Sequence, residues 1–378
     1  MVRVAHVITG LGLGGAEVML DRLISALDGR RVQSQVIGLT GGPIAARIRA
    51  QHVPLQVLRL SSTFGAVANI PRLASLLRAM RPDVVHTWMY HADFLGGLAA
   101  KLVGIPVIWA LHATALDPAD TNRSTLLLVR MLAKLSNVVP DRIVSCSQVG
   151  LGTHRDMGYP DSRMTVIPNG FDLYKFKPNQ QLRQKARASW GFGEDDIIVG
   201  HVGRFHPQKD HQSLLEAIAL AHARNRRLRL VCFGTDVTEG NARLMSWATG
   251  LGVLSCARFL GPHSRIQEVL PGFDIFASSS RFGEAFPLVI GEAMACAVPC
   301  AVTDVGDSAL LVGETGRVAP PAAPAALAEA LLALAALEPA GRRDLGALAN
   351  QRVRERYTLA HVADLYSQLY EDVAARRG

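Results

Sequence analysis

Residues 281–300, RFGEAFPLVIGEAMACAVPC, predict a loop, a helix and the start of a buried strand. Pro287 suits the first position of the helix, because its missing N–H would have no partner there. Leu288 to Cys296 then supply an apolar helix, and Pro299 ends it before the strand. The unpaired N–H groups and the positive dipole end of such a helix predict an anion site at its start.

Two glutamates flank this predicted helix start. Glu284 and Glu292 lie eight positions apart. In the second turn, Glu292 would stand behind the anion site, where a carboxylate can accept hydrogen bonds from sugar hydroxyls. The alternative is a core helix that carries two solvated glutamates.

The length and composition of the chain predict two domains of the α/β class. The chain has 378 residues, of which 49% are hydrophobic and 19% charged, so a large buried core is expected. Continuous Val-, Ile- and Ala-rich runs alternate with amphipathic stretches, as in parallel sheets covered by helices on both faces. We therefore predict two doubly wound, Rossmann-like domains that face each other across a cleft.

The cysteines and the apolar segments favour a cytoplasmic protein. The five cysteines are scattered along apolar runs, which is typical of reduced core residues. The start of the chain, MVRVAHVITGLGLGG, predicts a first strand and a loop rather than a signal peptide. The longest apolar run, ALAEALLALAAL at 326–337, contains Glu329 and is too short to span a bilayer.

The positive charge is confined to the first half. Residues 1–177 hold 19 Lys and Arg against 11 Asp and Glu, a net charge of +8, whereas the remainder holds 21 of each. This asymmetry predicts an anionic partner for the N-terminal half, such as a lipid-linked phosphate or the inner face of the cell membrane. The alternative is an ordinary basic surface.

A glycine loop follows the first predicted strand. Gly10, Gly12 and Gly15 satisfy the G-x-G-x-x-G pattern of dinucleotide-binding proteins. Those proteins have an acidic residue at the end of the second strand, but here SQVIGLT ends in Thr40. The pattern therefore disfavours a dehydrogenase and leaves a glycine loop whose backbone can approach a ligand closely at a helix N-terminus.

Histidines mark the ends of later strands. The strand PVIWALHAT places His112 at its carboxyl end, which in a parallel sheet faces the ligand crevice. His86 and His91 have a similar but weaker claim.

The strand, loop and helix pattern begins again in the second half. A strand runs into Gly203, and the following loop carries Arg204 and Lys209 before a helix. An arginine fork and a lysine point charge at this place predict a diphosphate clamp, the alternative being two solvated loop cations. We also expect a helix over IQEVLPGF, 266–273, and turns that include Gly306 and Gly313.

Five motifs in this order resemble one known family. They are GLGLGGAE, WALHAT, VIPNGFD, GRFHPQKD and EAFPLVIGEAMA, and they cover nearly the whole chain. Together they are similar to retaining glycosyltransferases of the GT-B fold in family 4. DPADTNRS, RFGEAFP and VGDSALLVGETG look most like transferases that assemble bacterial polysaccharides or lipid-linked glycans. The resemblance implies an acceptor-side domain at 1–175, a donor-binding domain at 176–355, and a helix at 356–378 that packs back on the first domain.

The resemblance also implies a nucleotide-sugar donor, with UDP as the expected nucleotide, and a glycan or lipid-linked acceptor. No nucleic-acid partner is expected. The implied site residues fall into a catalytic and a donor-binding group. The catalytic group comprises Glu284, His112, Arg204 and Lys209, and the donor-binding group comprises Gly14, Gly15, Gly203, Phe286, Pro287, Leu288 and Glu292.

Within these groups the family assigns individual roles. Residues matching Arg204 and Lys209 bind the diphosphate, the one matching Glu284 lies by the transferred sugar, and the one matching Glu292 holds the ribose. Pro287 stands where glycine is frequent, which removes one amide donor.

The expected chemistry needs neither a metal nor a cofactor. The sequence has no D-x-D motif, and the cations can stabilise the leaving diphosphate by themselves. With Glu292 on the ribose, no second carboxylate is an evident nucleophile for double displacement, so we predict retention by front-face attack. The alternatives are a sugar-nucleotide epimerase of similar fold and an inactive nucleotide-sugar-binding protein.

Overall fold

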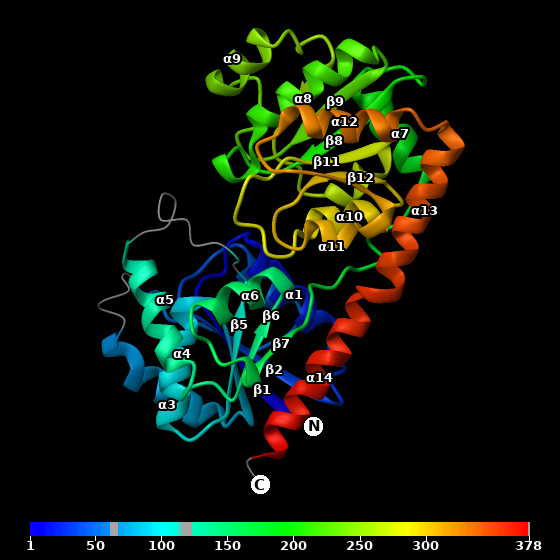
Figure 1. The fold of residues 1–378 in the computed structure, drawn as a ribbon. Coiled ribbons are helices and arrows are strands. Elements are labelled where there is room, and N and C mark those ends of the chain that lie inside the picture. Colours follow the sequence, from blue (N-terminus) through cyan, green and yellow to red (C-terminus); the bar gives the residue numbers. More distant parts are fainter. Residues whose placement is uncertain (61–66, 113, 115–122, 377–378) are drawn as a thin grey trace. The chain divides into compact units, whose positions relative to one another are not determined.

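The computed structural model describes residues 1–60, 67–112, 114 and 123–376, and it divides into two compact units. Unit 1 comprises residues 1–170 and 359–378, and unit 2 comprises 171–358 (Figure 1). The divisions fall at 170/171 and 358/359, whereas the sequence predicted 175/176 and 355/356. The two segments that connect the units lie side by side here, because the Phe171 N–H donates to the Tyr357 carbonyl at 2.8 Å.

Unit 1 contains one parallel sheet of seven strands. Their order across the sheet is β3 (Leu55–Val57), β2 (Val32–Gly38), β1 (Val2–Ile8), β4 (Val84–Trp88), β5 (Val107–Leu111), β6 (Arg142–Ser145) and β7 (Met164–Val166). The direction of strand addition reverses between β1 and β4, and ligands bind beside such a reversal in open α/β sheets.

Two helix layers cover this sheet (Figure 1). One layer consists of α3 (Ile70–Met80), α4 (Tyr90–Leu102) and α5 (Arg123–Leu135), and the other of α1 (Gly15–Ala26), α2 (Ile44–Ala50) and α14 (Leu359–Ala375). Successive residues of one strand pack against opposite layers: Val7 packs with α3, α4 and α5, and Ile8 packs with α1, α2 and α14. Helix α6 (Gln148–Asp156) and the short η1 (Val67–Asn69) and η2 (Asp161–Arg163) complete the described part of unit 1.

The C-terminal helix α14 is held on unit 1 by polar contacts as well as apolar ones. Arg31 pairs with Asp364 at 2.5 Å and with Glu371 at 2.9 Å. The Tyr370 hydroxyl lies 2.8 Å from Nδ1 of His86. His86 is therefore a fully buried core residue in the middle of β4, and the suggestion that it lines a site is wrong. Burial lowers the pKa of His86 well below its usual range.

Unit 2 contains a second parallel sheet, of six strands. Their order is β10 (Ala257–Phe259), β9 (Leu228–Phe233), β8 (Ile197–Val202), β11 (Ile275–Ser278), β12 (Cys300–Thr303) and β13 (Arg317–Ala319). The described helices are α7 (Gln180–Trp190), α8 (His211–Arg224), α9 (Ala242–Gly250), α10 (Leu288–Ala295), α11 (Ser308–Val312), α12 (Pro324–Ala335) and α13 (Pro339–Arg356). Short turns are η3 (Pro207–Lys209), η4 (Ile266–Glu268), η5 (Leu270–Gly272) and η6 (Gly313–Thr315). The order reverses between β8 and β11.

Several elements differ from the prediction. The helix expected over 266–273 is wrong: the segment forms η4 and η5, because Pro271 lacks the N–H that a continuous helix needs. Helices α7 and α13 were not predicted. Helix α7 is fastened by Arg183 and Arg187, which both contact the carboxylate of Asp274. Residues 117–122 of the DPADTNRS motif lie outside the described residues.

Among the described helices, none is by itself long and apolar enough to cross a membrane. The pair formed by α12 and α13 passes that test of length and composition together, but its two helices are bent by 109°.

Candidate active site

The predicted residues of unit 2 gather at the reversal point of its sheet. The loop after β8 carries Gly203, Arg204 and Lys209, and the loop after β11 carries Glu284. Because β8 and β11 are parallel neighbours, both loops leave the same edge of the sheet. Lys209 and Glu284, which are 75 positions apart in the sequence, therefore meet in space.

An ion pair joins these two loops. Lys209 Nζ contacts Glu284 Oε1, and the Ser280 hydroxyl donates to the same oxygen at 2.9 Å. The two charged side chains are only 18% and 11% exposed, so water screens their attraction weakly. The Ser279 hydroxyl donates to the Lys209 carbonyl at 2.7 Å. Sequence reasoning missed both serines, although two hydroxyls at the end of a buried strand were a usable signal.

Arg204 occupies a different environment in the same loop. Its side chain is exposed, and Nη2 lies 3.3 Å from the neutral amide oxygen of Gln208. The Gln208 carbonyl accepts from the Arg281 N–H at 2.8 Å, which adds a second link between the two loops. Lys209 therefore pairs with a carboxylate, whereas Arg204 is hydrogen bonded to a neutral amide.

Gly203 lies close against the side chain of Lys209. A Cβ at position 203 would lie 3.2 Å from the aliphatic stem of Lys209 and 3.1 Å from Nε2 of His201. Gly234, with φ of +157°, packs directly on the Gly203 carbonyl, where a side chain would overlap it. The two glycines let the β8 loop fold tightly enough to bring Lys209 to Glu284.

Helix α10 begins one residue later than predicted. Pro287 is its N-cap, with φ of −73° and an extended ψ of 109°, and Leu288 is the first helical residue. The assignment of Pro287 to the first helical position is therefore wrong. This shift has a consequence for binding, because Pro287 removes the amide of the cap only. The N–H groups of Leu288, Val289 and Ile290 remain, and first-turn amides have no acceptor four residues back within the helix.

Phe286 and Glu292 lie on either side of this helix start. The Phe286 ring is buried and stacks on Phe171, with centroids 6.1 Å apart, so the side chain anchors the loop. Glu292 is buried in the second turn of α10. Burial, and then the charge of Glu292, raise the pKa of the Cys296 thiol.

Gly306 supports the loop that carries Glu284. Its φ is +59°, and a Cβ there would overlap the Glu284 carbonyl oxygen. The neighbouring Asp307 N–H donates to the Ala285 carbonyl at 2.9 Å. The sequence predicted a turn at Gly306, and the packing of that turn on the Glu284 loop is an additional finding.

In unit 1, Gly14 is the N-cap of α1 and Gly15 its first residue. The space above the Cα of Gly15 is open, whereas the carboxylate of Glu17 lies beside Gly14. Burial raises the pKa of Glu17. A ligand phosphate at this helix start would therefore approach over Gly15, and Glu17 is a neighbour that sequence reasoning missed.

His112 directly follows β5, as predicted, and is half-buried. Its ring stacks on Trp88, with centroids 5.1 Å apart and an interplanar angle of 18°. Burial lowers its pKa to about 4, so the imidazole is neutral at pH 7 and can both donate and accept a hydrogen bond. The Thr9 hydroxyl lies 3.3 Å from the Trp88 carbonyl and connects this stack to the glycine loop. His91 lies in the first turn of α4.

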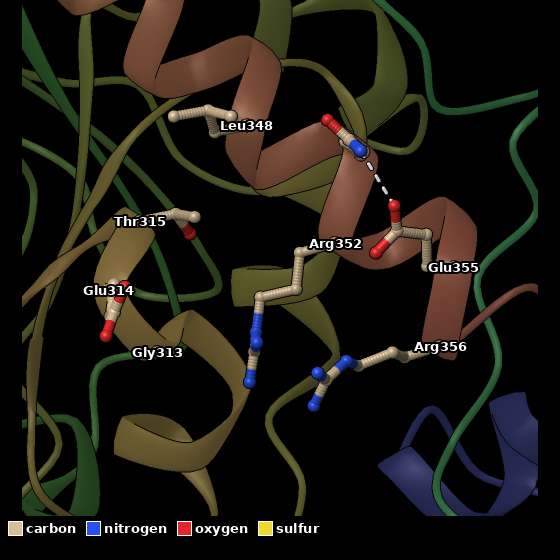
Figure 2. A pocket seen from close by; sticks show the side chains of 8 residues that line it. Gly313, Glu314, Thr315, Leu348, Arg352, Glu355 and Arg356 are labelled. Atoms are coloured by element: carbon tan, nitrogen blue, oxygen red, sulfur yellow. Dashed lines mark hydrogen bonds between the residues drawn. The ribbon is translucent and has the colours of Figure 1, made fainter.

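Two other observations bear on ligands. Among the described residues, no group of three or more His, Cys, Asp or Glu side chains is placed to hold a metal ion. A hollow of about 730 Å³ lies between η6 and α13, away from the residues named above (Figure 2). Arg352 in its wall donates to the carbonyls of Leu311 at 2.9 Å and Leu310 at 2.7 Å, which gives this arginine a structural role at the end of α11.

Known proteins share both the architecture and the motifs. Anabaena HepE in complex with UDP-glucose superimposes with a TM-score of 0.86, covering 98% of this chain and 100% of that one at 20% identity. A sucrose-phosphate synthase from Thermosynechococcus elongatus gives 0.81, with 100% of each chain covered and the same identity. These likenesses define the fold as GT-B, that of a glycosyltransferase with two Rossmann-like domains.

Sequence comparison then identifies the family. The model of glycosyltransferase family 4 matches residues 13–175, and that of glycosyl transferases group 1 matches 196–336. EpsF of Bacillus subtilis (strain 168), which is named as a glycosyltransferase, is 31% identical over 316 residues, or 80% of this chain and 79% of EpsF. An Escherichia coli UDP-Gal:α-D-GlcNAc-diphosphoundecaprenol α-1,3-galactosyltransferase is 26% identical, with 82% and 81% covered. The chain belongs to the group 1, family 4 glycosyltransferases.

Replacement of Gly306 by alanine tests the support of the Glu284 loop. We expect Gly306→Ala to lower the free energy of unfolding by about 2 kcal/mol or more, because alanine is strained at this positive φ and its methyl group meets the Glu284 backbone. We also expect slower glycosyl transfer, since the loop must shift. Chemical denaturation and transfer assays measure the two effects.

Gly250→Ala is the matched control. Gly250 ends α9, and a Cβ there meets nothing within 4 Å, so stability and transfer should be unchanged or slightly raised. Wild-type stability and wild-type transfer in Gly306→Ala would contradict the close packing on Glu284.

Proposed function

We propose that this glycosyltransferase moves a sugar from a UDP-sugar to a glycan or lipid-linked acceptor, with retention of configuration, in the synthesis of bacterial polysaccharides or cell-surface glycans. The observation that carries the proposal is the Lys209–Glu284 ion pair, with Arg204 beside it, at the reversal point of the unit 2 sheet. Cations and a carboxylate at one sheet edge suit a donor that combines a diphosphate with a sugar.

The names of similar proteins support the substrates. HepE of Anabaena has been crystallised with UDP and with UDP-glucose, which supports UDP as the nucleotide. The Escherichia coli relative is named for a UDP-Gal donor and for an acceptor on diphosphoundecaprenol, which supports a lipid-linked acceptor.

The proposed step breaks the bond between the anomeric carbon and the diphosphate oxygen. The electron pair of that bond stays on the leaving diphosphate, where Arg204, Lys209 and the first amides of α10 stabilise the growing negative charge. The acceptor oxygen bonds to the anomeric carbon from the same face, and its proton passes to the departing diphosphate oxygen. Each such preorganised donor typically contributes ~3–4 kcal/mol to lowering the barrier. Because these groups supply the stabilisation, we propose that the reaction is independent of metal and cofactor.

Glu284 controls Lys209 before the donor binds. The ammonium lies against the carboxylate in a poorly screened setting, so a diphosphate must compete for it. Glu284 itself is then turned toward the sugar, where positive charge develops on the ring. This exchange of partners links donor binding to the placement of the carboxylate.

The remaining residues recognise the rest of the substrates. We propose that buried Glu292 accepts hydrogen bonds from the ribose hydroxyls, and that in unit 1 the neutral His112 and the open backbone at Gly15 bind substrate. Unit 1 carries 19 Lys and Arg against 13 Asp and Glu, a net charge of +6. This charge supports peripheral association with an anionic membrane, at its cytoplasmic face.

A donor screen tests the function. The purified chain is offered UDP-, GDP- and ADP-sugars with lipid-linked sugar acceptors, and nucleotide release and product are measured. We expect release from a UDP-sugar only with an acceptor, and a product whose anomeric configuration by NMR matches the donor. Inversion would refute the front-face mechanism. Turnover of the donor without an acceptor product would indicate the epimerase, and binding of UDP without any turnover would indicate the inactive binding protein.

Removal of the charged groups at the reversal point tests the site. We expect Arg204→Ala, Lys209→Ala and Glu284→Ala each to lower the transfer rate at least ~100-fold, the scale of losing one transition-state donor. The affinity for UDP should distinguish the three variants. It weakens when either cation is lost, and it is kept or strengthened in Glu284→Ala because Lys209 is released from its carboxylate. Calorimetry with UDP measures this difference.

Arg226→Ala is the control, because Arg226 is an exposed cation of the same unit that lies outside the two loops. It should transfer at the wild-type rate. Near-normal rates in folded Arg204, Lys209 and Glu284 variants would refute the site assignment.

Glu292→Gln tests the ribose contact. The amide keeps the shape of the side chain but weakens its acceptance of hydrogen bonds, so KM for the donor should rise while kcat changes little. Steady-state kinetics with varied UDP-sugar measure both constants, with exposed Glu239→Gln as the matched control. A loss confined to kcat would argue against a ribose role.

A further inference from the structure

The positive charge of unit 1 is concentrated on one face. The segments 70–81, 90–102 and 123–135, which form the α3, α4 and α5 layer, carry seven basic residues, all exposed: Arg72, Arg78, Arg81, Lys101, Arg123, Arg130 and Lys134. The same segments contain one acidic residue, Asp93, which is fully buried. Burial raises the pKa of Asp93 well above its usual range.

The opposite helix layer has the reverse balance. Helices α1, α2 and α14 carry three basic and five acidic residues. The two layers, which the sheet separates, thus carry net charges of +6 and −2, and the other residues of unit 1 supply the remaining +2. An even basic surface would not show this segregation.

The basic face also exposes large apolar side chains. Leu127 and Met131 lie one helical turn apart on α5 and are 62% and 39% exposed, and Val138, just beyond the helix, is 59% exposed. Arg130 and Lys134 lie between them on the same side. A groove of about 830 Å³ is lined by Leu127, Arg130, Met131 and Lys134, together with Met157. We call Leu127, Arg130, Met131 and Lys134 the α5 strip.

We propose that the α5 strip docks the protein on an anionic lipid bilayer, with its cations at the headgroups and its apolar side chains in the interface. The charge and the apolar exposure are the combination that interfacial helices use on anionic membranes. A protein partner fits less well, since charged residues are depleted at the cores of protein interfaces and the strip has no aromatic residue, the type enriched there. The proposal rests on the proposed function insofar as a lipid-linked acceptor requires the enzyme at a membrane.

Vesicle flotation with the full chain tests the strip. The probes are vesicles of equal parts phosphatidylcholine and phosphatidylglycerol, and vesicles of phosphatidylcholine alone. We expect the wild type to bind the anionic vesicles and not the neutral ones, and added salt to weaken binding. Arg130→Glu with Lys134→Glu should weaken binding at least ~30-fold, the combined contribution of two basic residues near an anionic surface.

A second variant addresses the apolar part, and a third is the control. Leu127→Ser with Met131→Ser should weaken binding at least ~10-fold while leaving its salt dependence in place. Arg49→Glu with Arg376→Glu changes the net charge by the same amount as the first double variant, but lies on exposed positions outside the α3, α4 and α5 layer. It should bind almost as well as the wild type.

The outcomes separate the strip from the proposed function. Transfer to a water-soluble acceptor analogue without vesicles should be the same in all variants, since the strip is outside the candidate site. If the wild type does not transfer sugar at all, the proposed function is refuted, but the vesicle result still stands. Equal binding to neutral vesicles, equal loss in the control, or full binding by both strip variants would refute the strip. If random-sequence DNA binds as strongly as the anionic vesicles and the Arg130 and Lys134 substitutions abolish both, the face is a general polyanion site and the lipid assignment is wrong.

Discussion

The ion pair between Lys209 and Glu284 is the constraint on which unit 2 is built. Two charged side chains that are largely removed from water must meet with good geometry, because their desolvation is costly. The parallel sheet supplies that geometry by ending β8 and β11 at the same edge. Ser279 and Ser280 then fix the lysine backbone and the carboxylate. The positions of the site residues are therefore determined by the sheet more than by the loops that carry them.

Close backbone packing is the second condition for this pair. Gly234 lies on the carbonyl of Gly203, and Gly306 lies on that of Glu284, at distances that no side chain would allow. Each glycine belongs to the loop after a neighbouring strand, β9 or β12. Four adjacent strands thus contribute to one ligand edge, and a glycine stands at each point where a flanking loop packs on a loop of the site.

The sequence predicted the succession of strands and helices because strands buried on both faces appear as unbroken apolar runs. Prediction from the sequence was less reliable where a residue's role depends on a partner far away in the chain, or where a helix boundary depends on a single position. His86 resembles a site residue until Tyr370, 284 positions away, is seen to cover it. Pro287 suits a cap as well as a first helical position, so the helix start was misplaced by one residue. Helix α13 was not predicted because its sequence lacks a strong apolar period.

The spatial distribution of charge also could not be predicted from the sequence alone. Counting residues located the excess of +8 in positions 1–177, but a count cannot assign cations to one side of a sheet. The fold does so through α14, which returns from the far end of the chain. Asp364 and Glu371 on that helix neutralise Arg31 and make the layer they join slightly acidic. The return of α14 lowers the net charge of unit 1 to +6 and leaves the whole excess on the α3, α4 and α5 layer, where it stands beside exposed apolar side chains. A fold that segregates charge in this way gives one face a positive potential and leaves the other slightly acidic.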